Sequence, residues 1–273
     1  MNAPLPRVAA PAALVHAARY ERRVAASLAR IWENVLDWEH LPHLHASSFS
    51  AIDLEAAGPW GWRARLGLPG AAAAERVELV VDRPALSYCT RTVEGRLPGA
   101  EIRVGLKPLG PRLTDVTVDF HLPLPEGVDP APLGAAYVRV YERLWDEDEE
   151  MMRARQDALD AARGPLMPVR LGTPDEVRAR APFHVVFGGR PVAIVLADGV
   201  VAAHWAECPH MLGPLSLDPE NPGTLVCPWH DYRFPLGGGR ELGGRSCRLG
   251  PAPRIEAGAD GILSLQPAAA PPA

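Results

Sequence analysis

The sequence contains few cysteines, no excess of basic residues and no long hydrophobic run. Only 4 of its 273 residues are cysteines, too few for a disulfide framework in a chain of this length. The 28 Lys and Arg residues are outnumbered by 33 Asp and Glu residues, and this balance argues against nucleic acid or an anionic membrane as a partner. No segment approaches the roughly 20 apolar residues of a membrane span, and residues 1–15 lack the pattern of a secretory signal. We therefore expect a cytoplasmic protein.

The composition predicts a folded chain of two domains. Hydrophobic residues make up 47% of the sequence, which suffices for a sizeable core. At about 150 residues per domain, the length favours two domains. The 30 prolines and 25 glycines predict many loops and short strands. Gly164-Pro165 ends the last helical pattern of the first half, so we expect domains at residues 1–165 and 166–273.

The first half has the pattern of an antiparallel sheet followed by a long helix. Apolar and polar residues alternate over residues 60–66, 102–106 and 116–122, which is typical of strands with one buried and one solvated face. Residues 132–163 then show a helical pattern, and this helix is expected to lie across the sheet. The second half begins with short apolar strands separated by turns that contain glycine.

Two motifs in the second half bring cysteine and histidine together. Cys208-Pro-His210 is followed, after sixteen residues, by Cys227-Pro-Trp-His230. Two thiolates and two imidazoles can hold a [2Fe-2S] cluster, with sulfur ligands on one iron and nitrogen ligands on the other. The same four residues could hold a tetrahedral zinc ion, and their spacing alone does not distinguish the two metals.

The residues around the two motifs resemble the cluster-binding loops of Rieske proteins. The segments Cys-Pro-His-Met-Leu-Gly-Pro-Leu and Cys-Pro-Trp-His-Asp-Tyr-Arg-Phe carry a resemblance that covers most of residues 168–265. It implies a [2Fe-2S] cluster bound by Cys208, His210, Cys227 and His230. The extra cysteine pair of the cytochrome bc type is missing, so the resemblance is to the soluble, oxygenase-type domain. Met211 stands where that family commonly has arginine, which bears on docking of a redox partner.

A second candidate metal site lies in the first half. Asp37 is three residues before His40, so the two side chains are expected to share a helix face. Pro42 is expected to end or kink this helix, which would bring His45 round from the next turn or loop. Two imidazoles and one carboxylate form the facial triad of non-haem iron(II) oxygenases. Taken alone, these residues are equally consistent with a histidine-rich helix end that binds no metal.

The pattern Asn-x-x-Asp-x-x-His-x-x-x-x-His resembles the mononuclear-iron motif of Rieske non-haem iron oxygenases, the family of ring-hydroxylating oxygenase alpha subunits. It is matched at Asn34, Asp37, His40 and His45. The resemblance implies that His40 and His45 bind Fe(II). It implies that Asp37 bridges an iron-binding histidine and a cluster histidine, with Asn34 close to the site. It also implies that the ligating carboxylate comes from the long helix near residue 148.

Helical geometry selects one carboxylate from the acidic run at residues 146–150. Apolar residues of the helix form a stripe at about 100° per residue, and Asp148 falls near its middle, between Leu144 and Met151. A carboxylate aimed into an apolar core is costly unless it is paired or bound to a metal. We therefore predict Asp148 as the third iron ligand, and we expect the other four acidic residues on a solvated face.

Together the resemblances imply an α+β chain. A helix-grip (START/SRPBCC-like) catalytic domain would be followed by an all-β Rieske [2Fe-2S] domain. This order is the reverse of that in most family members, which form head-to-tail trimers where one subunit's cluster serves its neighbour's iron. We expect a homo-oligomer, with a homotrimer favoured, and electron transfer either within one chain or between chains.

The expected activity is that of a mono- or dioxygenase. It would hydroxylate or oxidatively demethylate a largely apolar, cyclic or aromatic small molecule with O2. Because no flavin or nicotinamide motif is present, electrons would come from a separate NAD(P)H-dependent reductase, with or without a ferredoxin. Aromatic residues expected to line the cup, or else to pack in the core, are Trp60, Trp62, Phe120 and Tyr137. The main alternative is a lipid- or ligand-binding helix-grip domain fused to a Rieske electron-transfer module, and a weaker one is a zinc-bearing scaffold.

Overall fold

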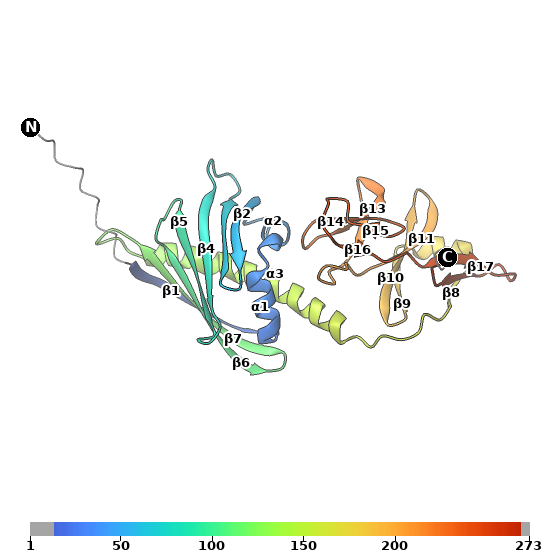
Figure 1. The fold of residues 1–273 in the computed structure, drawn as a ribbon, viewed down its shortest axis with the longest axis horizontal. Helices are drawn as coiled ribbons and strands as arrows, with labels where there is room; N and C mark the ends of the chain where they lie inside the picture. Colours follow the sequence, from blue (N-terminus) through green and yellow to red (C-terminus); the bar gives the residue numbers. More distant parts are fainter. Residues whose placement is uncertain (1–13, 269–273) are drawn as a thin grey trace, which may run out of the picture. The chain divides into compact units, whose positions relative to one another are not determined.

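The structure is a computed structural model that describes residues 14–268. The chain forms two compact units, one up to Met152 and one from Arg153 onward (Figure 1). The division falls inside the long helix α3 (Ala131–Asp160). The boundary expected from the sequence was residue 165, where the helical pattern stops. The observed division after Met152 reflects how the residues pack.

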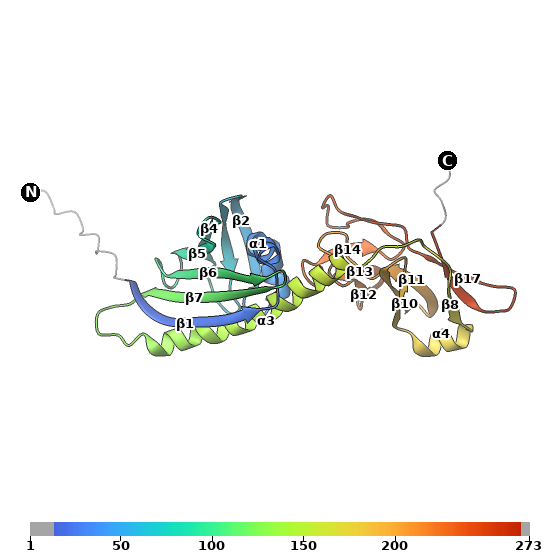
Figure 2. The same cartoon turned by 90° about the horizontal axis from the view of Figure 1, so that it is seen from below.

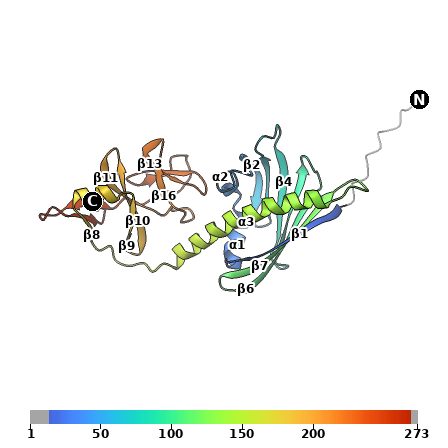
Figure 3. The ribbon, with the colours of Figure 1, turned by 180° about the vertical axis from the view of Figure 1, so that it is seen from behind.

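The first unit is an antiparallel sheet packed on one long helix. Its strands follow the order β1-β7-β6-β5-β4-β3-β2, so the first strand pairs with the last. Their bounds are β1 (Leu14–Val24), β2 (Ala51–Gly58), β3 (Gly61–Gly67), β4 (Glu75–Asp82), β5 (Ser87–Glu94), β6 (Glu101–Gly110) and β7 (Leu113–Pro123). Figures 2 and 3 show α3 lying along one face of this sheet. Trp145 and Met152 of α3 share a core with residues of β3 to β7, which is the helix-grip arrangement.

Alternation along the strands sets which side chains enter this core. Four residues of β7 are at most 1% exposed: Val116, Val118, Phe120 and Leu122. The residues between them are partly exposed, as the sequence pattern predicts. Trp60 breaks the pattern expected over residues 60–66, because it lies in the turn before β3 and is 39% exposed. The strand begins only at Gly61, whose φ of 130° and close approach to the Leu79 carbonyl group exclude a side chain.

Short helical segments connect β1 to β2. They are α1 (Leu28–Leu36), the 3-10 helix η1 (Trp38–His40) and α2 (Leu41–Leu44). The first helix ends at Leu36 with Asp37 as its C-cap, and Pro42 lies in the first turn of α2. The expectation that Pro42 ends or kinks the helix is therefore wrong, because a proline in the first turn removes no helical hydrogen bond. The indole N–H of Trp62 donates to the Val35 carbonyl oxygen at 3.0 Å and ties α1 to β3.

The second unit consists mainly of short strands in small antiparallel sheets. Three-stranded sheets have the orders β11-β10-β9, β12-β13-β14 and β17-β18-β8, and β15 pairs with β16. The bounds are β8 (Val169–Gly172), α4 (Pro174–Arg180), β9 (Phe183–Phe187), β10 (Arg190–Ala197), β11 (Val200–Trp205), β12 (Ser216–Asp218), β13 (Asn221–Cys227), β14 (Tyr232–Pro235), β15 (Gly239–Arg240), β16 (Arg248–Leu249), β17 (Arg254–Ala257) and β18 (Leu263–Gln266). The predicted α+β fold class, with a helix-grip unit before a mostly β unit, is confirmed. Between residues 14 and 268, no helix combines the length and apolar character of a bilayer span.

Gly134 provides a test of how closely α3 packs on the sheet. The register of β1 shifts between His16 and Ala18, and a Cβ at Gly134 would lie 2.3 Å from the Ala17 carbonyl oxygen. Alanine is the better helix former by about 1 kcal/mol. We nevertheless expect Gly134→Ala to destabilise the protein by about 1–3 kcal/mol, because backbone must move to admit the methyl group. Thermal unfolding followed by circular dichroism measures the effect.

The control for this variant is Gly105→Ala in β6, where an added Cβ would meet open space. Its melting temperature should not fall. If Gly134→Ala melted at the wild-type temperature as well, the contact between α3 and β1 would be looser than described.

Candidate functional site

The two cysteine–histidine loops share one backbone conformation. Cys208 follows β11, and Cys227 is the last residue of β13. In each loop, the residue four positions after the cysteine has a positive φ, 63° at Leu212 and 54° at Asp231. Its N–H donates to the carbonyl oxygen of that cysteine at 2.9 Å. Leucine seldom adopts this left-handed conformation, whereas aspartate does so more readily. Both loops nevertheless make the same tight turn.

The four predicted cluster ligands have the burial and proximity that a cluster requires. Cys208, Cys227 and His230 are at most 1% exposed, and the rings of His210 and His230 lie 4.6 Å apart between centroids. All four cysteines of the chain are free. The neighbouring Cys227 sulfur, together with burial, raises the pKa of the Cys208 thiol. Paired thiols beside paired imidazoles fit a [2Fe-2S] cluster with sulfur on one iron and nitrogen on the other.

Contacts within the second unit hold these loops in place. Glu207, next to Cys208, is 4% exposed and pairs with Arg190 at 3.0 Å. A Cβ at Gly213 would lie 2.9 Å from the Cys227 sulfur, so the backbone of the first loop packs directly against a predicted cluster ligand of the second. Only glycine allows this approach.

The ring of His210 is held by aromatic stacking. Tyr232 stacks on it with 4.4 Å between ring centroids and an interplanar angle of 10°. The Arg245 guanidinium lies over the Tyr232 ring at 4.4 Å, within the range of a cation–π interaction. The backbone N–H of Arg245 donates to the buried Glu241 carboxylate at 3.0 Å, which fixes the arginine loop. The stack thereby restricts rotation of the His210 imidazole.

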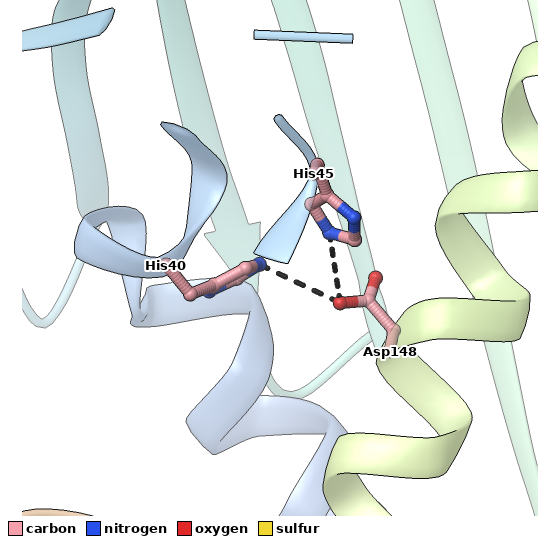
Figure 4. A group of neighbouring side chains, drawn as sticks. All are labelled: His40, His45 and Asp148. Atoms are coloured by element: carbon pink, nitrogen blue, oxygen red, sulfur yellow. Dashed lines mark hydrogen bonds and ion pairs between the residues drawn. The ribbon is translucent and has the colours of Figure 1, made fainter. Parts of the chain in front are cut away.

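In the first unit, His40, His45 and Asp148 converge on one point (Figure 4). His45 Nε2 lies 3.0 Å and His40 Nε2 lies 3.5 Å from the same atom, Asp148 Oδ1. The two histidines are at most 3% exposed, and the Asp148 side chain is 13% exposed. One ligand atom from each residue lies within 4.8 Å of the others. The short helices before β2 thus meet α3 at this point.

The spacing of these atoms fits a divalent metal ion. Bonds of about 2.1 Å from a metal to nitrogen and oxygen place neighbouring ligand atoms about 3.0–3.4 Å apart. The two distances from the histidine nitrogens to Asp148 Oδ1, 3.0 and 3.5 Å, are close to this range. Glu147 Oε2 lies 2.5 Å from His45 Nδ1. When Nδ1 donates its proton to Glu147, the lone pair of Nε2 faces the Asp148 carboxylate. That arrangement is favourable only with a proton or a cation between the two atoms.

Neighbouring polar groups make the site strongly attractive to positive charge. Asp37 Oδ2 lies 3.5 Å from His40 Nδ1, and the Asn34 amide N–H donates to Asp148 Oδ1 at 2.8 Å. Burial lowers the pKa of His40, but the carboxylates of Asp148 and Asp37 outweigh burial and raise it to about 9. Burial raises the pKa of Asp148, but hydrogen bonds from His40 and His45 lower it below its usual range. An ionised carboxylate therefore lies at the centre of the group.

The acidic run of α3 does not form the solvated face expected from the sequence. Glu147 contacts His45, 102 residues away. Glu149 is 14% exposed, accepts the Ala25 N–H at 2.8 Å and pairs with Arg22 at 2.5 Å. The expectation is wrong for Glu147 and Glu149, because both bind groups from the amino-terminal part of the unit. These contacts fix the rotation of α3 about its axis.

A cavity of about 120 Å³ borders the three converging side chains. Its apolar lining includes Trp62, Leu66, Val77, Leu79 and Trp145. Tyr88, Thr90 and Tyr141 add hydroxyl groups to an otherwise apolar wall. The site thus combines a candidate metal centre with space for a small, largely apolar ligand.

The aromatic residues expected in the cup take different positions. Trp62 lines the cavity, whereas Trp60 lies in an exposed turn. Phe120 is fully buried behind the cavity, where its ring packs against Tyr137 at 5.4 Å and Tyr141 at 5.0 Å. Strand alternation identifies the residues that point inwards, but it does not tell which of them border empty space. For the same reason Tyr88 and Tyr141 could not be assigned to the cavity from the sequence, although Tyr88 has the alternation of an inward-facing residue.

Residues 167–248 match the family model described as the Rieske [2Fe-2S] domain. The match includes both cysteine–histidine loops, so the second unit contains a Rieske domain, with the [2Fe-2S] cluster and the part in electron transfer or oxygenase chemistry that this implies. Among curated proteins, no match to the chain was found.

Solved structures similar to this chain align with about half of it. A START superfamily protein from Mycobacterium smegmatis is 23% identical, with a TM-score of 0.42 over 51% of this chain and 98% of that protein. Norcoclaurine synthase from Thalictrum flavum, in complex with dopamine and hydroxybenzaldehyde, is 17% identical, with a TM-score of 0.40 over 51% of this chain and 87% of the synthase. A protein from Thermus thermophilus is 22% identical, with a TM-score of 0.40 over 50% of this chain and 96% of that protein.

The close approach at Gly213 predicts a loss of cluster on substitution. In Gly213→Ala the new methyl group would contact the Cys227 sulfur and the Trp229 ring, so one of them must move. We expect cluster occupancy to fall by about half or more, as measured by iron and acid-labile sulfide per chain. Gly237→Ala, which adds a methyl group in open space, serves as the control and should keep full occupancy. Equal occupancy in the two variants would contradict the described packing.

The contact between Glu147 and His45 predicts a role in metal affinity. A carboxylate that accepts the second N–H of a metal-binding imidazole orients the ring, and its loss typically weakens binding 10–100-fold. We therefore expect Glu147→Gln to raise the Kd for Mn²⁺ by about 10-fold or more, measured by the EPR signal of the free ion. The control is Glu150→Gln on the exposed side of the same helix. A wild-type Kd in Glu147→Gln would show that His45 is oriented without this carboxylate.

Proposed function

We propose that this protein is a Rieske-type non-haem iron oxygenase. It consumes O2, two electrons and two protons to hydroxylate a largely apolar, cyclic or aromatic molecule, with water as the second product. Oxidative demethylation of such a molecule consumes the same reactants and releases formaldehyde as well as water. The observation that carries the proposal is the convergence of His40, His45 and Asp148 beside an apolar cavity. Two imidazoles and one carboxylate are the ligands of non-haem iron oxygenases, and they leave coordination positions open.

The first unit supplies the residues that hold Fe(II). His40 Nε2, His45 Nε2 and Asp148 Oδ1 face one another and are the proposed ligand atoms. When bound, the iron supplies activation of O2, and the [2Fe-2S] cluster supplies electrons one at a time. Glu147 holds the His45 ring through Nδ1, and Asn34 orients the Asp148 carboxylate. The apolar walls of the cavity exclude water from the reacting part of the substrate.

Asp37 is the proposed link between the two centres. Its carboxylate lies 3.5 Å from His40 Nδ1, on the imidazole nitrogen away from Asp148, where it can hold the proton of that nitrogen. The cluster is the group that would accept the electrons. The residues proposed to hold it are Cys208, His210, Cys227 and His230. The electrons come from a separate NAD(P)H-dependent reductase, with or without a ferredoxin. Delivery to the mononuclear site takes place within one chain or between the chains of a homotrimer.

The competing function is ligand binding by the helix-grip unit, joined to an electron-transfer module that performs no oxygen chemistry. The Rieske domain and the cavity are compatible with both functions. The convergence of His40, His45 and Asp148 favours the oxygenase, because these three side chains are metal ligands that a protein which only carries a ligand does not need.

Metal content separates the two functions. A cluster with one mononuclear site contains about three irons and two sulfides per chain, whereas an electron-transfer module contains about two irons. We expect His40→Ala and Asp148→Asn each to lose about one iron, while the EPR signal of the reduced cluster is retained. In both variants, the EPR signal formed when nitric oxide binds the mononuclear Fe(II) should disappear.

Activity is tested by one turnover of the chemically reduced protein with O2 and toluene. Mass spectrometry should detect a hydroxylated product from the wild type and at least about 100-fold less from Asp148→Asn. Glu150→Gln is the control on the same helix and should match the wild type. About two irons per wild-type chain, or full product from Asp148→Asn, would refute the oxygenase proposal.

A further inference from the structure

Two tyrosines in the cavity have no part in the proposed metal site. Tyr88 lies on β5 and Tyr141 on α3, and both line the same cavity as His40, His45 and Asp148. Tyr88 is only 9% exposed. Within residues 14–268, neither tyrosine hydroxyl has a hydrogen-bond partner. Tyr141 is two helical turns before Asp148 and so lies on the same face of α3.

Unpartnered hydroxyl groups in a cavity indicate what the occupant must offer. Neither hydroxyl is sealed from the cavity, so each can be hydrated while the cavity holds only water. An occupant that displaces this water without replacing its hydrogen bonds binds less favourably. Burial raises the pKa of Tyr88 and of Tyr141 above the ordinary value, and the charge of Asp148 adds to this effect. Both phenols therefore keep their protons and act as donors. The group that satisfies them is an acceptor oxygen, such as that of a hydroxyl or a carbonyl.

The size of the cavity limits the rest of the ligand. An apolar cavity of about 150 Å³ in a protein core holds one benzene molecule. The cavity here, of about 120 Å³, is of similar size and is lined by Trp62, Leu79 and Trp145 besides the polar groups. Its enclosed space is therefore about that of one six-membered ring.

We propose that the protein binds a single-ring molecule with an oxygen substituent, which accepts hydrogen bonds from Tyr88 and Tyr141 while its ring contacts the apolar wall. The two tyrosines are specificity-determining residues, because a ring with an oxygen substituent binds them more tightly than a ring with a methyl group of the same size. This inference names the substrate class of the proposed oxygenase and rests on that function for its reaction, but the binding step can be measured without turnover.

The test compares phenol with toluene, two probes of nearly equal size that differ in the group offered to the tyrosines. Calorimetric titration of the full-length protein should give a Kd for phenol about tenfold lower than that for toluene. Tyr88→Phe and Tyr141→Phe should each reduce this preference several-fold, and the double variant should abolish it. The Kd for toluene should stay constant, which shows that the cavity itself is intact.

The control is Tyr20→Phe on β1, a tyrosine of the same unit outside the cavity, whose hydroxyl already has Arg22 as a partner. It should keep the full preference for phenol. A wild-type protein that binds neither probe, or both equally, would overturn the inference, as would an unchanged preference in the double variant. The variant Asp148→Asn separates this result from the oxygenase proposal. If it still binds phenol more tightly than toluene but forms no product, the binding site is supported independently of the oxygen chemistry.

Discussion

One carboxylate oxygen, Asp148 Oδ1, is the point on which the first unit depends. Side chains from three separate segments surround it: Asn34 of α1, His40 of η1 and His45 after α2. An ionised group in an apolar interior is tolerated only with such partners, and removal of one partner from a buried pair typically costs about 3–5 kcal/mol. The segments between β1 and β2 are therefore held against α3 by charge as much as by apolar packing. The cavity borders this polar group.

The neighbours of Asp148 along α3 turn this contact into a defined geometry. Successive residues of a helix point in directions about 100° apart, so Glu147, Asp148 and Glu149 reach different partners. Glu147 contacts His45, and Glu149 accepts the Ala25 N–H. The helix is thus fixed in rotation by three consecutive carboxylates, and the sheet needs only to supply apolar walls. Because the polar contacts come from α3 and the apolar walls come from the sheet, a fold with an apolar cup can hold a charged group.

Features that depend on residues close together in the sequence could be predicted, and features that depend on distant segments could not. The cluster loops were predictable because Cys208 and His210 are two residues apart and their chemistry is set within one turn. The inward position of Asp148 was predictable because helical periodicity placed it among apolar neighbours. The contacts of Glu147 and the position of Tyr88 at a cavity were not, because they depend on side chains brought together from distant segments. Trp60 was misplaced because a turn interrupts the strand alternation at Gly61.

The contact of His45 with two adjacent acidic residues has a kinetic consequence. Glu147 contacts Nδ1 and Asp148 contacts Nε2, so both nitrogens of the imidazole are held by adjacent residues of α3. The ring cannot flip or swing aside unless the Glu147 contact breaks first. In the proposed oxygenase, a metal ion held by His40, His45 and Asp148 would therefore leave only after this contact opened, and its residence time would depend on that local opening as well as on the strength of its bonds.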